Sequence, residues 1–439
     1  MTSVAEQPNP YLANFPAFAA RISGQAWTQR LRESAIERFA ELGFPTTRDE
    51  EWRFTNVAPI ARAAFEPAAY TPHAITPEQL DRRLFADSSA CRLVFVNGHF
   101  AAELSCAGKM PAGVRTGSLA RVLAEQPALV EPHLARYAAF ENHAFVALNT
   151  ALWEDGGFVW VPKGVVVEAP IHLVFVSTGG APPAVSHPRT LIVAERASQV
   201  TIVESYLGPG GEGYFTNPVT EISTGEGAIV DHYKLQREGD DAFHVGTVQA
   251  QLGRSANFTS HSISLGGALV RSDTNAVLSE GTEVTLNGFY LAAGRQHVDH
   301  HIAVDHAKPH GASHELYKGI LDGKASAVFN GRILVRKDAQ KTDAKQTNKN
   351  LVLSEDAVIN TKPELQIYAD DVRCTHGATI GQLDPEGIFY LQSRGIGKEE
   401  ARDLLTYAFA RDVIDRIRVE PLRERLEQVL FERLHDHRQ

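Results

Sequence analysis

Two stretches, EGTEVTLNGFYL at residues 280–291 and GKASAVFNGRIL at residues 323–334, decide the fold. They align with Asn287-Gly288 on Asn330-Gly331, an offset of 43 residues. In both, a small residue or glycine turn precedes a short apolar strand pattern. Related segments begin near Ala197, Ala228, Ala256 and Ala357. A loose repeat with variable spacing indicates the stacked coils of a solenoid whose loops differ in length.

The sequence around these repeats is rich in strand patterns from about Gly157 onward. Runs of four to eight β-branched and aromatic residues alternate with Gly, Asn, Asp and Ser, as in RTLIVAERASQVTIVESYL at residues 189–207. Helical periodicity is almost absent there. Two-residue hairpin turns are not the rule, because most linkers are longer. The pattern favours a mainly β chain with a parallel β-helix core, and a large β-sandwich is the competing interpretation.

Both ends of the chain are predicted to be helical. Trp27, Leu31, Ala35, Phe39 and Leu42 recur at helical spacing before Gly43, and a second helical stretch spans about 118–153 with a break near Pro132. Near the C-terminus, residues 398–417 and a segment beginning at Pro421 form two amphipathic helices. We therefore expect a mostly helical region at 1–155, a β-helix at 156–393 and a helical region at 394–439. The apolar faces of the last helices must pack on the solenoid or on another protein.

The composition is that of a globular cytoplasmic protein. The 439 residues are 43% hydrophobic and 22% charged, with a net charge of −10, which argues against nucleic acid or an anionic membrane as the main partner. The N-terminus lacks the pattern of a secretory signal, and no apolar run is long enough to cross a membrane. The three cysteines, Cys91, Cys106 and Cys374, give no disulfide framework. A permanently bound iron-sulfur cluster usually needs about four thiolates, which this chain alone cannot supply.

The stretch HVDHHIAVDH at residues 297–306 suggests a metal site. On a strand, however, His297, Asp299 and His301 point one way, whereas His300 and His306 point the other. The ligands are then split between two faces. The pattern therefore favours a polar outer face with a few inner histidines, and its role stays open.

Cys374 and His376, in DDVRCTHGA at residues 370–378, form the more specific chemical motif. In an extended strand the thiol and the imidazole project from one face. Two such ligands make half of a tetrahedral site, which needs about two more donors. The other cysteines lie far away in the sequence, so we expect a second chain to complete the site. A small apolar cysteine beside a surface histidine is the structural alternative.

Several of these segments resemble one known family. The stretches HVDHHIAVDH (297–306), SHELYKGILDGKASAVFNGRILV (313–335) and the run from AQKTDAK to LQSRGI (339–396) are similar to the signature region of the SufB/SufD family of the SUF iron-sulfur cluster assembly machinery. PTTRDEEWRFTN at residues 45–56 resembles the N-terminal region of that family. DDVRCTHGATIG at residues 370–381 looks more like the SufD branch than the SufB branch.

The resemblance implies a right-handed parallel β-helix flanked by helical regions, in a scaffold subunit that is not an enzyme. It implies pairing with a SufB-like paralogue, docking of a SufC-like ATPase on the C-terminal helices, and a possible homodimer of the chain alone. Cys374 and His376 would lie at the SufB-facing edge as transient ligands of a nascent cluster shared with the partner, with His376 the better candidate. No cofactor would be held permanently, and flavin would enter only through the complex.

Two rival functions follow from the same patterns. A β-helix enzyme acting on polysaccharide would use acidic residues along one solenoid face, such as Asp370 and Asp371. A SufB-like paralogue would instead retain a chromophoric cluster when isolated.

Overall fold

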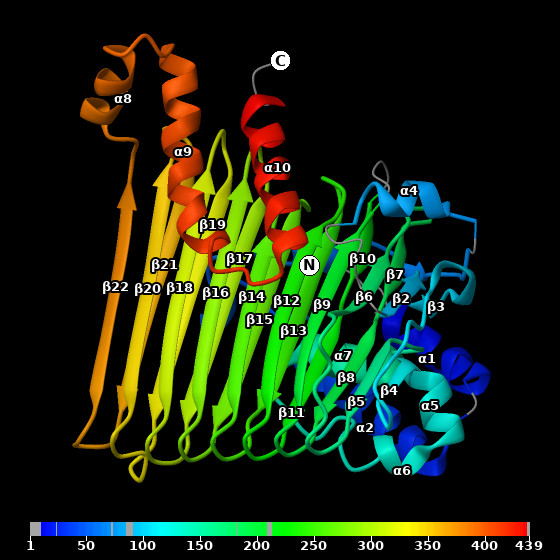
Figure 1. Ribbon diagram of the computed structural model, residues 1–439. Coiled ribbons are helices and arrows are strands. Elements are labelled where there is room, and N and C mark those ends of the chain that lie inside the picture. Colours follow the sequence, from blue (N-terminus) through cyan, green and yellow to red (C-terminus); the bar gives the residue numbers. More distant parts are fainter. Residues whose placement is uncertain are drawn as a thin grey trace, which may run out of the picture.

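The computed structural model describes residues 10–22, 24–71, 73–84, 91–180, 182–208 and 213–436, with side chains to residue 433. Two long sheets face each other, and the chain crosses from one to the other at every turn (Figure 1). This is a β-solenoid of about seven turns with helices at both ends of the chain, which confirms the predicted fold class and excludes the β-sandwich.

In each sheet, the last strand of the chain lies at one end, and the earlier strands follow it in spatial order. The first sheet contains β21 (Val358–Ile367), β19 (Ser326–Val335), β17 (His297–His306), β15 (Leu269–Leu278), β13 (Phe243–Gln251), β11 (Val219–Thr224), β8 (Arg189–Ala194), β5 (Gly157–Val161) and β4 (Arg115–Ser118), with the short strands β1 (Glu66–Pro67), β7 (Ala184–Ser186) and β10 (Tyr214–Thr216) beside it. The second contains β22 (Arg373–Gly381), β20 (Asp343–Val352), β18 (Ala312–Leu321), β16 (Glu283–Ala292), β14 (Asn257–Ser264), β12 (Ile229–Arg237), β9 (Gln199–Leu207), β6 (Ile171–Val176), β2 (Cys91–Val96) and β3 (His99–Phe100).

The turns of the solenoid stack in register because neighbouring strands are parallel. β16 pairs with β18 and β18 with β20 without a bulge, so each inward side chain lies above its equivalent in the next turn. The corners explain the small residues of the repeat. Gly281 and Gly323 have φ values of 65° and 66°, in the left-handed region that favours glycine. Buried Ala325 follows one such corner, where a larger side chain would not fit.

Most of the N-terminal helices cover the outer side of the first sheet, whereas Leu80 and Leu104, on two short helical elements, pack against β2 and β6 of the second sheet. The helical elements of this region are α1 (Pro10–Arg21), α2 (Ala26–Leu42), η1 (Glu50–Trp52), α3 (Ala58–Arg62), α4 (Pro77–Asp81), η2 (Ala102–Leu104), α5 (Leu119–Glu125), α6 (Pro127–Val130) and α7 (Ala144–Leu152). Phe39 and Phe145 pack with Val245 and Leu269 of the sheet. α2 agrees with the predicted helix and ends at Gly43, and the stretch predicted over 118–153 with one break near Pro132 is divided into three short helices.

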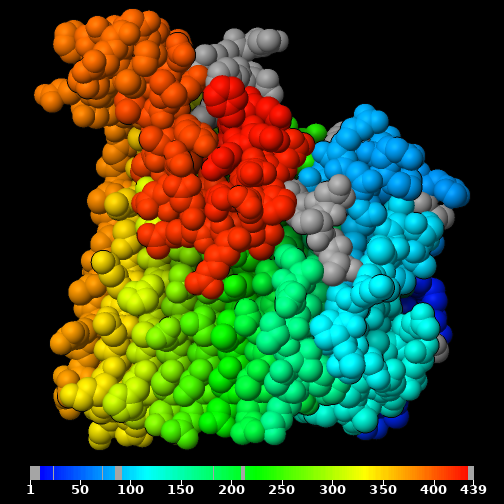
Figure 2. Space-filling view, in the orientation of Figure 1, coloured from blue at the N-terminus to red at the C-terminus, as the bar shows by residue number. Residues whose placement is uncertain are grey.

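The C-terminal helices are α8 (Pro385–Gln392), α9 (Lys398–Ile414) and α10 (Glu420–Asp436). Val413 of α9 and Leu422 and Leu426 of α10 pack against Tyr233 and Leu235 of β12. Figure 2 shows both helices, in orange and red, lying over the outer face of the second sheet. They therefore cover a side wall of the solenoid and leave its end uncovered. Among the described residues, no helix is long and apolar enough to cross a membrane.

Candidate functional site

The free end of the solenoid is formed by β21 and β22, the last strand of each sheet (Figure 1). Within the described ranges, β22 pairs along one side only, with β20. The N–H of Arg373 donates to the carbonyl of Thr342 next to β20. Because backbone groups alternate in direction along a parallel strand, those of Cys374, His376 and Ala378 point to the open side. Such an edge is a template for another strand.

The structure places Cys374 and His376 on one face of β22, the face toward the solenoid interior. In the register of the sheet, Cys374 is paired with Ala344 and His376 with Gln346. Both partners on β20 are buried inside the solenoid. Paired residues of parallel strands share a face, so the thiol and the imidazole belong to the inner row of the last turn. No further turn covers them, and His376 is exposed.

The environment of Cys374 keeps its sulfur protonated. The side chain is half-buried against an apolar cluster that includes Val335 and Ala344. Burial, reinforced by the neighbouring Asp343 carboxylate, raises the pKa of the Cys374 thiol above its ordinary value. The thiolate is the form that binds metal, so Cys374 needs a positive group or an iron ion from outside the chain to ionise it.

The remaining cysteines cannot complete a site with Cys374. Cys91 lies on β2 and is buried. The backbone of Cys106 forms an isolated antiparallel β-bridge with Arg92 of the same strand. Seven strands separate β2 from β22 in the second sheet. At ~4.8 Å per strand this distance is roughly 38 Å. In the described part of the chain, no group of three or more His, Cys, Asp and Glu side chains could hold a metal ion.

The histidines of β17 are divided between the two faces, as the alternation predicts. Inside the solenoid, His300 Nε2 lies 3.2 Å from Ser264 Oγ and His306 Nε2 lies 2.9 Å from Ser313 Oγ. The outer residues have a different role: Asp299 and His301 hold the segment that contains η1 against the first sheet.

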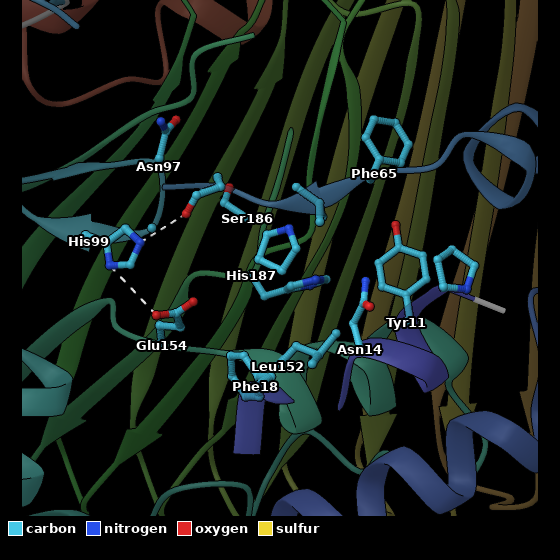
Figure 3. A pocket seen from close by; sticks show the side chains of 15 residues that line it. Tyr11, Asn14, Phe18, Phe65, Asn97, His99, Leu152, Glu154, Ser186 and His187 are labelled. Atoms are coloured by element: carbon cyan, nitrogen blue, oxygen red, sulfur yellow. Dashed lines mark hydrogen bonds and ion pairs between the residues drawn. The ribbon is translucent and has the colours of Figure 1, made fainter. Parts of the chain in front are cut away.

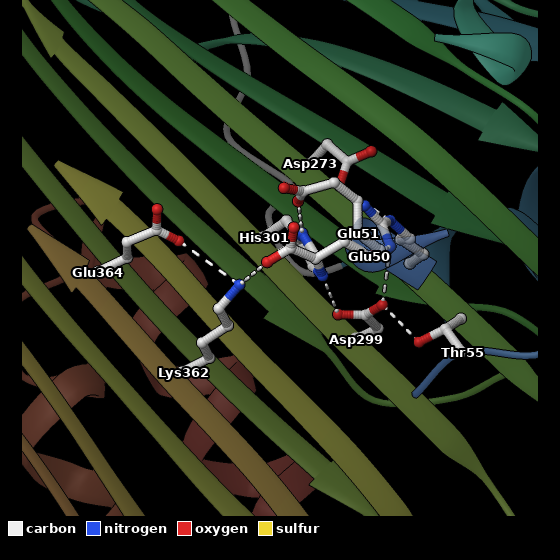
Figure 4. Close-up of polar contacts among 9 residues, drawn as sticks. Glu50, Glu51, Thr55, Asp273, Asp299, His301, Lys362 and Glu364 are labelled. Carbon is white, nitrogen blue, oxygen red and sulfur yellow. Dashed lines mark hydrogen bonds and ion pairs between the residues drawn. The ribbon is translucent and has the colours of Figure 1, made fainter. Parts of the chain in front are cut away.

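This outer cluster is shown in Figure 4. Thr55 donates to Asp299 at 2.5 Å, and Arg271 Nη1 lies 3.1 Å from the same carboxylate. His301 Nε2 lies 3.0 Å from Asp299 Oδ1 and His301 Nδ1 lies 3.3 Å from Glu51. The Arg271 guanidinium also stacks 3.7 Å from the Trp52 ring centroid. No sequence pattern predicts this contact, although PTTRDEEWRFTN (45–56) contains three of the residues.

Replacing His301 by glutamine is expected to remove a pH dependence of stability. Burial alone would lower the pKa of His301, but the Asp299 charge and the contact with Glu51 outweigh it and raise this pKa to about 9. A histidine whose pKa is raised in the folded state stabilises the fold fully below its unfolded-state pKa of about 6.5. This stabilisation is lost as the pH rises through 9. We expect the wild type to lose about 1–3 kcal/mol of unfolding free energy between pH 6 and pH 9.5.

The measurement is urea unfolding of the wild type, His301→Gln and His314→Gln at both pH values. His314 is an exposed histidine on the neighbouring sheet and serves as the control. His314→Gln should retain the pH dependence and His301→Gln should lose most of it. Equal pH dependence in all three proteins would contradict the assignment.

A separate pocket lies between α1 and the first sheet, far along the chain from β22. Figure 3 shows Tyr11, Phe65 and His187 around it. His187 is buried, and burial lowers its pKa to about 3. The cavity volume is about 30 Å³, which is room for one or two water molecules and too little for a cofactor. It contains none of the residues singled out by the sequence.

The fold and the open end define a class of protein: a parallel β-solenoid that displays a thiol and an imidazole on a terminal strand with one open edge. Residues 175–409 match the family model described as SUF system FeS cluster assembly, SufBD core domain, and residues 9–173 match the SufBD protein N-terminal region. The chain belongs to the SufBD family of iron-sulfur cluster assembly proteins.

Relatives of similar length support this membership. The chain is 38% identical to an iron-sulfur cluster assembly SufBD family protein of Synechocystis sp., over 90% of this chain and 89% of the relative. It is 30% identical to the iron-sulfur cluster assembly protein SufD of Escherichia coli, over 91% of each chain. The SufD of Bacillus subtilis is 27% identical over 94% of this chain and 95% of the relative. This membership favours cluster assembly over the polysaccharide-active alternative.

Proposed function

We propose that this chain is a SufD-like scaffold subunit, without turnover of its own, that shares a nascent iron-sulfur cluster site with a SufB-like paralogue. One observation carries the proposal: the edge strand β22, paired on one side only, presents Cys374 and His376 where no described residue of the same chain can complete a metal site. A soft sulfur and an imidazole nitrogen suit iron, which would be cargo at this site. The two further donors that a tetrahedral iron needs would come from the partner.

The open edge supports pairing as well as ligation. A second solenoid placed end to end would satisfy the free backbone groups of β22 and bury the apolar inner side chain of Ile380, which is exposed in the single chain. The paralogue is the proposed partner in the complex, and a homodimer is the proposed state of the chain alone. Such a scaffold would work in the cytoplasm and would hold no cofactor permanently, with any flavin entering through the complex.

The C-terminal region supports docking of a SufC-like ATPase. α8 presents Phe389 and Tyr390, which are 72% and 56% exposed. Leu404 of α9 and Phe431 of α10 are also exposed, whereas the opposite faces of these two helices pack on the solenoid. Exposed aromatic and aliphatic side chains on helices that are already anchored suit a partner surface.

The test is cluster assembly in complexes purified without oxygen after co-expression with the SufB-like and SufC-like partners. Iron and sulfide per complex are measured for the wild type, His376→Ala, Cys374→Ala and Thr375→Ala. His376→Ala should lower cluster content several-fold, and Cys374→Ala should lower it by a smaller factor. Thr375 lies between them on the opposite face of β22, so Thr375→Ala should leave the content unchanged.

Two results would contradict the proposal. Normal cluster content in both His376→Ala and Cys374→Ala would remove the site assignment while leaving the scaffold role. A stable chromophoric cluster on the isolated chain would instead indicate a SufB-like subunit.

A further inference from the structure

A row of polar residues leads inward from His376 along the second sheet. Glu315 of β18, Gln346 of β20 and His376 of β22 occupy the same position in three successive turns. Glu315 and Gln346 are buried in the solenoid interior. Neighbouring turns are separated by ~4.8 Å, so a glutamine side chain can reach both the turn behind it and the turn ahead.

One hydrogen bond sets the direction of the Gln346 amide, and a glycine makes room for it. Its Nε2 donates to Glu315 Oε2 at 2.7 Å. Gly331 on the facing strand β19 makes room for the amide, because a Cβ at that position would lie 2.2 Å from Gln346 Nε2. With the nitrogen held by Glu315, the amide oxygen is the group left free.

The free oxygen lacks a partner. Gln346 Oε1 is buried and makes no hydrogen bond to any described residue. A buried acceptor without a donor costs free energy, so it marks a place where a donor belongs. The next residue outward in the row is His376, whose neutral ring carries one N–H donor.

We propose that Gln346 is a positioning residue, which accepts the N–H of one ring nitrogen of His376 and leaves the other nitrogen free to bind at the open end. The inference rests on the proposed role of His376. Histidines that bind metal commonly donate their second nitrogen to a carbonyl or carboxylate, which fixes the tautomer and the ring orientation. Glu315 acts one step further back by holding the amide.

The charge of Glu315 is consistent with this arrangement. Burial raises the pKa of Glu315 to about 7, against the hydrogen bond from Gln346, which favours the ionised form. In the ionised form, which this hydrogen bond favours, the carboxylate can only accept hydrogen bonds. Gln346 is then unable to turn its oxygen toward Glu315, so the oxygen stays available to His376.

The experiment reads the tautomer of His376 in the isolated full chain at pH 8 by ¹⁵N NMR of histidine-labelled protein. The His376 signals are assigned by their loss in His376→Gln. Wild type should show one dominant tautomer. Gln346→Met, which keeps the length but removes the acceptor, should lower the tautomer ratio at least threefold. Gln346→Glu, which keeps an acceptor, should retain one dominant tautomer, and Thr347→Val on the opposite face of β20 is the control.

Two outcomes would overturn the inference. One is a wild-type tautomer ratio equal to that of a free histidine peptide, a result that needs no variant to fold. The other is an unchanged ratio in a folded Gln346→Met protein. Neither outcome depends on cluster loading, so failure of this inference is distinguishable from failure of the proposed function, which His376→Ala tests in the complex.

Discussion

Replacing Ala378 by proline is expected to weaken association with the proposed SufB-like partner at least ~100-fold while leaving the chain folded. The backbone N–H of Ala378 points to the open side of β22, because the N–H of Arg373 is directed to β20 and directions alternate along the strand. Proline at this position therefore removes a donor to the partner and keeps every bond to β20. Its ring also obstructs an approaching strand.

Two energetic costs determine the expected weakening of association. One missing hydrogen bond leaves a buried acceptor on the partner, which costs about 1–3 kcal/mol. Displacement of the neighbouring backbone by the ring adds to this cost, and ~2.7 kcal/mol already corresponds to a hundredfold change in Kd. The measurement is the Kd between the purified chain and its paralogue, together with the melting temperature of each variant alone.

Ala378→Val is the matched control, because it enlarges the side chain on the inner face and keeps the N–H. It should weaken association much less than proline does. An Ala378→Pro protein that binds its paralogue with wild-type affinity would show that β22 is not the pairing strand.

Replacing Glu221 by glutamine is expected to lower the free energy of unfolding by about 3–5 kcal/mol. Glu221 is fully buried on β11 and lies 2.6 Å from Arg189, which is only 1% exposed. It also accepts backbone hydrogen bonds from Ala135, Tyr137 and Ala138 at 2.8–2.9 Å. Glutamine would leave the buried guanidinium without a counter-charge and would direct an N–H at groups that are themselves donors.

Urea unfolding at pH 7 measures this effect. The control is Glu125→Gln, which removes the exposed ion pair between Arg121 and Glu125 on α5 and should change stability by less than about 0.5 kcal/mol. A loss below about 1 kcal/mol for Glu221→Gln would show that the ion pair and the loop it holds contribute little to the fold.

The solenoid could be predicted from sequence because each turn repeats the same local pattern. Small residues at the corners and apolar residues at alternate positions are local signals, as Ala325 and the strand after it illustrate. The packing of the N-terminal segment could not be predicted in this way. Thr55 and Asp299 are 244 residues apart in sequence, and neither residue has a neighbour that marks it as the partner of the other.

The candidate site was predictable in part, because alternation along a single strand is also a local pattern. Alternation along one strand placed Cys374 and His376 on a common face, and the structure places both on β22. Alternation does not say that this face is the inner one or that β22 is the last strand. The sequence does not connect Glu315 and Gln346 with His376, because their relation depends on the register between turns, which loops of variable length conceal.

The two ends of the solenoid differ, and this difference sets the size of any assembly. At the far end, the described residues place antiparallel β3 and β4 and the helix α5 against the first turns. Within the described residues, β3 and β4 are short, reversed edges that do not match the long parallel edge of β22. A pair formed through β22, as proposed, would offer no matching edge to a further copy, so the stacking that would permit an endless fibre would be self-limiting.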